Sequence, residues 1–362
     1  MRAASDTVRQ LVADGVPQVT WVADLMYDRE RRLANIPIER PRVSWDAGQF
    51  VAGDAQVRVV WSDDFGTSMV PKVLGDWFSP FGAELQIDVI LGAGVFSERV
   101  PMGRFVIESV PDATDREILF DGRPIRVGQS FGLNLKDPLM RVARDEFPFP
   151  TAPRSTSAWQ EIQAVSGMPV IRNASDVTLA GGTVYEGEKA AQLSKLFDLL
   201  DAWPQVDASG TLTARQKTWP GPVGAVRGVV DAPISMDSSK TYNRVVVEGK
   251  TAGGDPIYGV ADVTEGFLRV SNVDGTASPF GVSVYRYASD QLYTQSQVDA
   301  YARGLLQRVS RIRGVTRQIV EPFNPLRELG DVLTFEDGVV RVASVTHDTA
   351  TTQLVVEVPD AA

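Results

Sequence analysis

Short runs of alternating apolar and polar residues fill the chain between Val16 and Val127, and clusters of Gly, Pro and Asp separate them. Alternation with a period of two buries one face of each run, which is typical of antiparallel strands. Apart from a helix predicted over residues 5–13, no helical pattern interrupts this stretch. It therefore predicts a β-barrel or sandwich of roughly 100 residues. The predicted strands are residues 19–27, 57–61, 85–91, 103–110 and 117–120.

Helical spacing of apolar residues appears in the middle of the chain. A first helix is predicted over residues 158–165, with Ser155 or Thr156 as its N-cap and Glu161 supporting its first turn. A second helix with one broad apolar face is predicted over residues 188–202.

Pro204 is expected to end the second helix. Residues 206–214 then carry an Asp-Ala-Ser-Gly turn between two strand-like pieces. We interpret residues 131–220 as a small α+β unit in which a helix packs on a hairpin.

Strand patterns return from Val226, and one helix over residues 294–311 interrupts them. The predicted strands of this part are residues 243–249, 266–270, 282–287, 314–322, 331–335, 339–345 and 354–358. The fold class is therefore mainly β with an α+β insert, and it contains two β-barrel-like domains. The predicted domains are residues 1–130 (first β-barrel-like domain), 131–225 (α+β domain) and 226–362 (second β-barrel-like domain, with helix 294–311).

Composition removes several classes of function. The 362 residues include 36 Lys and Arg against 46 Asp and Glu, and the net charge of −10 argues against a broad nucleic-acid-binding surface. There is no Cys and a single His, His347, so cysteine chemistry and a His-based zinc centre are excluded. No signal-peptide core and no run of about 18 apolar residues is present. We expect a soluble protein made in the cytoplasm, with no metal and no cofactor.

Gly128-Gln-Ser-Phe-Gly132 matches the G-x-S-x-G pattern of a hydrolase nucleophile elbow, with Ser130 as nucleophile and His347 following as base. An elbow needs a strand-to-helix turn, and the residues up to Pro138 are too broken to form the long helix. We interpret residues 128–132 as a glycine-bounded linker between domains and assign no catalytic residue.

Other polar motifs are interpreted as structural. Asp63 and Asp64 are adjacent and would face opposite sides of a strand, so we interpret them as a solvated hairpin tip. Residues 91–95, Leu-Gly-Ala-Gly-Val, lack the third glycine and the helix of a dinucleotide site and are interpreted as a strand-ending turn. His347 and Asp348 are interpreted as a turn. Scattered Trp residues are interpreted as core residues rather than a saccharide platform, namely Trp21, Trp45, Trp61, Trp77 and Trp159.

Three stretches together resemble phage tail hub proteins. Residues 298–310 followed by residues 321–333 and 342–347 resemble the helix-then-strand signature of these hubs. In this pattern Leu326 is expected to plug the barrel, and Gly330-Asp331 to form the tight turn into the next strand. Similarity to the siphophage minor tail proteins is found at residues 78–87 and 100–109, as in their first barrel, and at residues 195–212, as in their middle domain.

The resemblance implies a tail-tip or baseplate hub of the myophage type. Three subunits, each supplying two barrels, would form a ring with pseudo-sixfold symmetry that joins a sixfold tail tube to a threefold tip. The implied partners are the distal tail protein ring, the tape-measure protein and other tail-tip or receptor-binding proteins in the virion. Genomic DNA would pass through the lumen without specific binding, which suits an acidic chain. The long C-terminal peptidase or fibre modules of many relatives are not expected here.

Two alternatives follow from the residues themselves. Exposed Trp and Tyr would suit a tail-tip protein that binds a host saccharide or receptor. Ser130 with His347 would suit a serine hydrolase.

Overall fold

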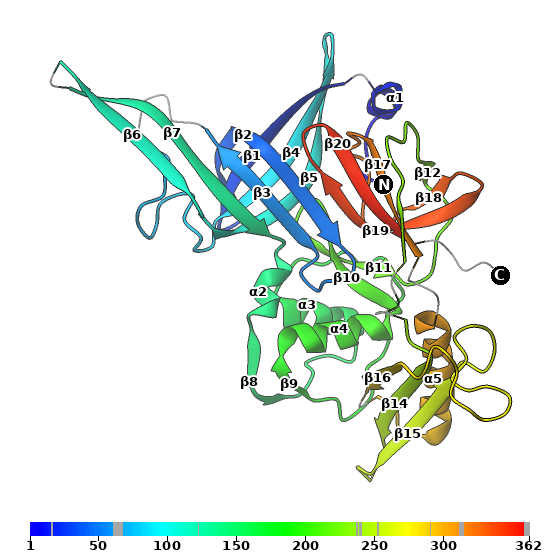
Figure 1. Ribbon diagram of the computed structural model, residues 1–362. Coiled ribbons are helices and arrows are strands. Elements are labelled where there is room, and N and C mark those ends of the chain that lie inside the picture. Colours follow the sequence, from blue (N-terminus) through cyan, green and yellow to red (C-terminus); the bar gives the residue numbers. More distant parts are fainter. Residues whose placement is uncertain are drawn as a thin grey trace.

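Strands from both parts of the chain pair in one 13-stranded sheet in the computed structural model (Figure 1). The structure describes all residues except 16, 61–67, 122, 237, 239–240, 252, 290, 311–314 and 358–362. The protein is mainly β, as the alternating pattern predicts, and the large sheet is antiparallel apart from the pairing of β12 with β18. No helix in the described part of the chain is long and apolar enough to cross a membrane.

Six of the first seven strands are closed into a cycle of pairings by the contact between β1 and β2. Around this cycle β1 pairs with β4, β4 with β5, β5 with β7, β7 with β3, β3 with β2 and β2 with β1. β6 extends β7 as a hairpin that projects from the sheet (Figure 1). The strands are β1 (Gln18–Tyr27), β2 (Glu30–Asp46), β3 (Gly53–Val59), β4 (Glu84–Ala93), β5 (Phe96–Ser109), β6 (Ala113–Phe120) and β7 (Arg123–Lys136).

The core of this N-terminal region follows from the alternation along its strands. In β3 every second residue is buried, and β4 and β5 contribute a row of fully buried aliphatic and aromatic side chains, including Leu85, Ile87 and Phe105. Helix α1 (Asp6–Asp14) begins at Ser5, whose side chain accepts a hydrogen bond from Val8 N, and it buries Val8 against this core. Leu326, far along the sequence, also lies in this core and is 3% exposed.

The C-terminal strands continue the same sheet. β19 pairs with β20 on one side and with β2 on the other, and β20 leads to β17 and β13. They surround a separate core that contains Ile319, Val342, Val345 and Leu354. The strands are β12 (Gly224–Ala225), β13 (Ile234–Met236), β17 (Val315–Pro322), β18 (Val332–Phe335), β19 (Gly338–His347) and β20 (Thr351–Glu357).

A mixed helix and strand segment lies beside the large sheet and has its own core around Trp159, Leu193 and Phe197 (Figure 1). The predicted hairpin is confirmed, because Asp207 Oδ1 accepts hydrogen bonds from Ser209 N and Thr211 N in the turn between β10 and β11. The elements are α2 (Leu139–Ala143), β8 (Glu146–Thr151), α3 (Ala158–Ser166), β9 (Tyr185–Glu188), α4 (Lys189–Leu199), β10 (Ala202–Val206) and β11 (Leu212–Gln216).

Two details of this segment correct the predictions. The N-cap of α3 is Ser157, not Ser155 or Thr156, and its hydroxyl accepts a hydrogen bond from Gln160 N. Pro204 does not end α4 but lies inside β10, because the chain already turns at Asp201, which has a φ of 51°.

A third sheet, β15–β14–β16, is covered on one face by helix α5, and the two form a core of their own. The predicted helix 294–311 is confirmed as α5 (Gln295–Val309), capped by Thr294 and Gln297. The predicted strand 266–270 is wrong: Gly266 has a φ of 74° and Phe267 is 91% exposed, so the chain turns there. The strands are β14 (Arg244–Lys250), β15 (Pro256–Asp262) and β16 (Val284–Ala288).

The described part of the chain has four hydrophobic cores, and they do not define the borders of the predicted domains. β7 runs through the predicted border at residue 130, and the third sheet with α5 packs apart from the strands on either side of it. The division into domains 1–130, 131–225 and 226–362 stays a prediction.

Candidate functional site at the junction of the β regions

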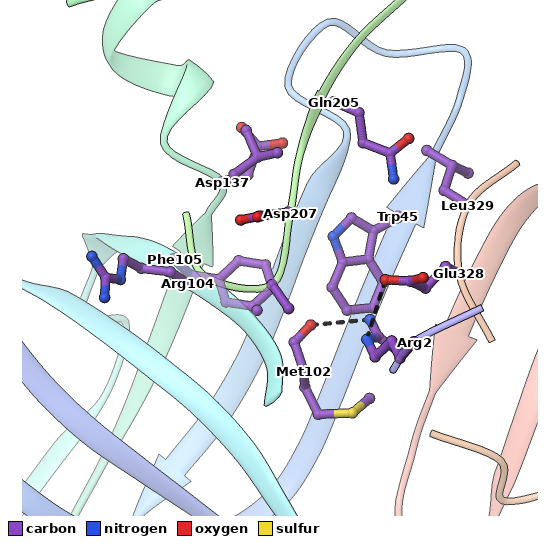
Figure 2. Close-up of a pocket in the computed structure, with 13 residues that line it drawn as sticks. Arg2, Trp45, Met102, Arg104, Phe105, Asp137, Gln205, Asp207, Glu328 and Leu329 are labelled. Carbon is purple, nitrogen blue, oxygen red and sulfur yellow. Dashed lines mark hydrogen bonds and ion pairs between the residues drawn. The ribbon is translucent and has the colours of Figure 1, made fainter. Parts of the chain in front are cut away.

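Four segments far apart in the sequence meet where β2 pairs with β19. They are the N-terminal residues, the middle of β5, the turn between β10 and β11, and residues 324–331, which precede β18 (Figure 2). The pocket between them has a volume of about 20 Å³ and is lined by Arg2, Trp45, Phe105 and Asp207 among others. A cavity of this size holds about one water molecule, so it suits packing rather than a substrate.

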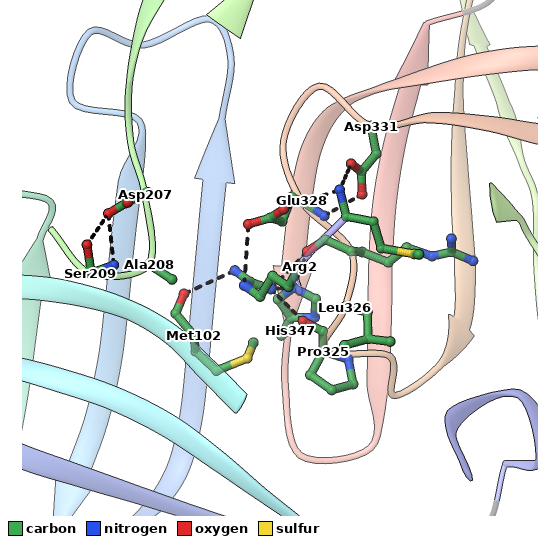
Figure 3. Close-up of polar contacts among 12 residues, drawn as sticks. Arg2, Met102, Asp207, Ala208, Ser209, Pro325, Leu326, Glu328, Asp331 and His347 are labelled. Carbon is green, nitrogen blue, oxygen red and sulfur yellow. Dashed lines mark hydrogen bonds and ion pairs between the residues drawn. The ribbon is translucent and has the colours of Figure 1, made fainter. Parts of the chain in front are cut away.

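The large sheet has two β regions, the N-terminal strands β1–β7 and the C-terminal strands β12, β13 and β17–β20. Arg2 joins these two β regions through hydrogen bonds to main-chain carbonyls (Figure 3). Its Nη1 donates to Pro325 O at 2.6 Å and to Arg327 O at 2.9 Å, and its Nη2 donates to Met102 O of β5 at 3.0 Å. The guanidinium carbon lies 4.8 Å from the centroid of the Trp45 ring.

Acidic groups complete the surroundings of Arg2. Glu328 Oε1 is 3.8 Å from its Nε, and the main-chain amine of Met1 contacts Asp331 and Glu328. Burial lowers the pKa of Arg2, and the charges of Glu328 and Asp331 oppose that effect. Both terminal nitrogens of this buried cation therefore have acceptors, as buried polar groups require.

His347 lies at the end of β19, fully buried between Trp45 and Phe323. Its Nδ1 is 3.0 Å from Thr352 Oγ1 and its Nε2 is 3.3 Å from Arg327 O. Burial, together with the charge of Arg2, lowers the pKa of His347 well below its usual range, so the imidazole is neutral. The turn expected here begins one residue later, where Asp348 Oδ1 accepts hydrogen bonds from Ala350 N and Thr351 N.

Ser130 does not sit in a linker or on an elbow. It lies inside β7, opposite Thr114 of β6, and its hydroxyl accepts a hydrogen bond from Arg58 Nη1 at 2.9 Å. Both ring nitrogens of His347 face other partners, so the structure does not bring the two residues together as nucleophile and base. The linker interpretation of residues 128–132 is wrong because every one of these residues pairs within the sheet or extends it.

The remaining sequence candidates are structural or lie outside the described residues. Gly94, with a φ of 62°, forms the turn between β4 and β5, so residues 91–95 are a strand-ending turn as predicted. Asp63, Asp64 and Trp61 lie outside the described residues. Trp21 and Trp159 are core residues, whereas Trp77 is 47% exposed. Within the described ranges no cluster of three or more His, Asp or Glu side chains could hold a metal ion.

Asp137 is a buried carboxyl that the sequence reasoning missed. Its Oδ2 accepts a hydrogen bond from Gly53 N at 2.6 Å and its Oδ1 accepts one from Leu139 N at 2.8 Å, which ties the end of β7 to β3 and to α2. Burial raises the pKa of Asp137 to about 6, although these main-chain donors oppose the rise. The Asp-Pro pair before an apolar run is a local signal for such a turn. No comparable signal marks Arg2.

Comparisons with known proteins address the fold. No protein-family model and no curated protein matches the sequence. Among solved structures, the chain is similar in fold to phage tail proteins over nearly its full length.

The tail protein from Neisseria meningitidis MC58 superposes with a TM-score of 0.61 at 12% identity, covering 94% of this chain and 97% of that one. The 43 kDa tail protein of prophage MuSo2 from Shewanella oneidensis superposes with a TM-score of 0.56 at 10% identity, covering 94% and 99%. The predicted resemblance to phage tail proteins is confirmed at the level of the fold.

Proposed function

We propose that this chain is a structural protein of a phage tail tip, a baseplate hub that forms a trimeric ring closing the distal end of the tail tube. The observation that carries the proposal is the fold similarity to two phage tail proteins over 94% of the chain. The closed cycle of pairings among β1, β2, β3, β4, β5 and β7 supports the first of the two predicted barrels. The strands from β17 to β20 are the candidate for the second barrel.

The proposed role is mechanical rather than enzymatic. The ring would lie in the virion between the distal tail protein ring and the tip or receptor-binding proteins, contact the tape-measure protein, and open for DNA. The different hydrogen-bond partners of Ser130 and His347 support a role without catalysis. The net charge of −10 suits a lumen that DNA crosses without binding.

Negative-stain imaging of the purified chain at high concentration tests this proposal, with particles classified by symmetry. We expect threefold rings with a central hole. Particles that stay compact monomers, both alone and after mixing with a distal tail protein ring, would contradict the hub.

A second candidate is a saccharide-binding or receptor-binding tail-tip protein, and one exposed aromatic group favours it. Trp77 is 47%, Phe81 61% and Tyr27 46% exposed, and all three lie near the turn between β1 and β2. Arg32, next to this turn, places its guanidinium 5.9 Å from the Trp77 ring centroid. Aromatic rings of this kind stack on sugars.

Binding to host wall polysaccharide tests the second candidate. We expect wild-type binding to be lost in Trp77→Ala and kept in Trp159→Phe, in which a buried indole is replaced instead. Equal binding by all three proteins would contradict a role for this surface.

A further inference from the structure

Arg215 is another buried arginine near the junction, and no hydrogen-bond acceptor in the described part of the chain contacts its guanidinium. It lies in β11 directly opposite Trp203 of β10, and only 9% of its surface is exposed. Its guanidinium carbon is 4.7 Å from the centroid of the Trp203 ring. Within the described part of the chain its guanidinium forms no hydrogen bond and no ion pair, and its Nε is fully buried without a partner. A buried cation in this state is costly unless an anion joins it.

Two more cations surround the same indole. Arg341 of β19 lies 5.2 Å and Lys217 lies 5.7 Å from the Trp203 ring centroid. Arg341 donates to the main-chain carbonyls of Lys217 and Gln216, and Lys217 Nζ pairs with Asp198. These contacts fix the positions of Arg341 and Lys217, but none of them brings a carboxylate into contact with Arg215.

Charges of both signs act on Arg215. Burial and the charge of Arg341 lower the pKa of Arg215 to about 10, and the charges of Glu357 and Asp46 oppose this effect. The Arg215 guanidinium provides N–H donors in a planar fork, which is the arrangement that carboxylates and phosphates bind. Arg341, whose terminal nitrogens donate to the carbonyls of Gln216 and Lys217, adds a second positive charge at the same indole.

The site is also held in place before any ligand arrives. Gly330 has a φ of 83°, and a Cβ atom at this position would lie 2.8 Å from Arg215 Cδ. The aliphatic part of Arg215 therefore packs closely against Gly330, while the indole of Trp203 covers the head group. A side chain restrained on two sides loses little conformational entropy on binding.

We propose that Arg215, Arg341 and Trp203 form a binding site for one oxyanion. The chemistry is that of a carboxylate or phosphate group, and it has two sources: a free inorganic anion, or an acidic side chain of a second copy of this chain. The site lies where β10 and β11 approach β19 (Figure 1), and it is independent of the proposed hub function.

Thermal unfolding in rising inorganic phosphate, with chloride adjusted to constant ionic strength, tests the first source. We expect a saturable rise in Tm for the wild type, and an apparent affinity at least about tenfold weaker in Arg215→Met because a charged hydrogen-bond donor is lost. Arg317→Met is the matched control. Arg317 also lies over an aromatic ring, that of Phe335, but already has Glu336 as partner at 2.7 Å, so its removal should leave the phosphate response unchanged.

Sedimentation equilibrium of the same proteins tests the second source. If the occupant is an acidic side chain of a second copy, phosphate gives no saturable shift, and the wild type self-associates in a way that Arg215→Met loses and Arg317→Met keeps. Arg215→Lys, which keeps the charge but not the planar fork, decides the question if Arg215→Met does not fold, and we expect it to bind about tenfold more weakly than wild type. Equal phosphate response and equal association in wild type and both Arg215 variants would overturn the proposal.

Discussion

Arg2 and Arg215 are both buried and both pack against residues 324–331, yet their surroundings differ in one respect. Arg2 donates to three main-chain carbonyls and lies near two carboxylates. Arg215 touches an aromatic ring and another cation and has no acceptor among the described residues. In the first arrangement both terminal nitrogens have acceptors within the chain, and Nε, which forms no hydrogen bond among the described residues, lies 3.8 Å from Glu328, which is typical of a structural role. The second is incomplete, which indicates a ligand or partner.

The largest expected effect is that of Arg2→Met. The change leaves the carbonyls of Met102, Pro325 and Arg327 without their donor inside the junction, so we expect the free energy of unfolding to fall by about 4 kcal/mol. Urea denaturation measures it. Arg9→Met, on the exposed side of α1, is the control and should change stability by no more than about 0.5 kcal/mol. Equal losses in the two variants would show that Arg2 is not the link between the β regions.

Leu326→Ala tests whether residues 324–331 stabilise the N-terminal core as well as binding Arg2. Leu326 is 3% exposed inside that core, so truncation should cost about 3 kcal/mol. Leu119→Ala, at a position 79% exposed on the β6–β7 hairpin, should be nearly neutral in the same denaturation measurement. A loss below about 1 kcal/mol for Leu326→Ala would contradict the packing.

Asp137 is a buried acid, and its raised pKa makes the free energy of unfolding depend on pH. Its folded-state pKa of about 6 lies above its ordinary value of 3.8, so between these values the folded chain binds more protons than the unfolded chain. This group therefore lowers stability as pH rises from about 4 to 6, by up to about 3 kcal/mol. Carboxyls with lowered pKa values, such as Asp24 and Asp348, act in the opposite direction, so the effect of Asp137 is measured as the difference in unfolding free energy between wild type and a variant without this carboxyl.

The matched variant for this pH effect is Asp137→Asn, which carries no titrating group. The unfolding free energy of the wild type minus that of the variant should decline by up to about 3 kcal/mol between pH 4 and 6, whatever the absolute stability of either protein. A difference that does not change with pH would assign no such effect to Asp137.

The smallest expected change in stability is that of Arg215→Met. Because no acceptor within the described chain loses a bond, replacing this cation by an apolar side chain should leave the free energy of unfolding within about 1 kcal/mol of wild type, or raise it slightly, in chloride buffer. The difference between the stability losses of Arg2→Met and Arg215→Met tests whether the two arginines have different roles. A loss as large as that of Arg2→Met would mean that Arg215 is structural.

The sequence predicts those parts of the fold in which local pattern and tertiary environment agree. Helices α3 and α5 have a periodicity that is visible in the sequence, and so is the Asp-Ala-Ser-Gly turn at Asp207. The long strand β2 was missed because polar residues interrupt its alternation. It also contains Asn35 and Arg40 at positive φ, and its pairing with β3 shifts register between Glu39 and Arg42.

The junction could not be predicted from local pattern. Arg2 meets Pro325 across 323 positions of sequence, and Arg215 is brought next to Arg341 only by the packing of β10 and β11 against the large sheet. Neither arginine has a spacing or a motif that distinguishes it from the other basic residues of the chain. The resemblance to tail proteins supplied the fold, but it assigned no role to either residue.

The pairing of Asp46 in β2 with Ser344 in β19 has a consequence for how the chain is made. Ribosomes add roughly 5 to 20 residues per second, so β2 waits on the order of tens of seconds before its partner strand exists. During that interval one edge of β2, and the cavity that Leu326 later fills, are open to the solvent and to other nascent chains. The N-terminal β region therefore completes its folding only after the C-terminal β region has been synthesised. A chaperone that covers this edge of β2 would act during that delay.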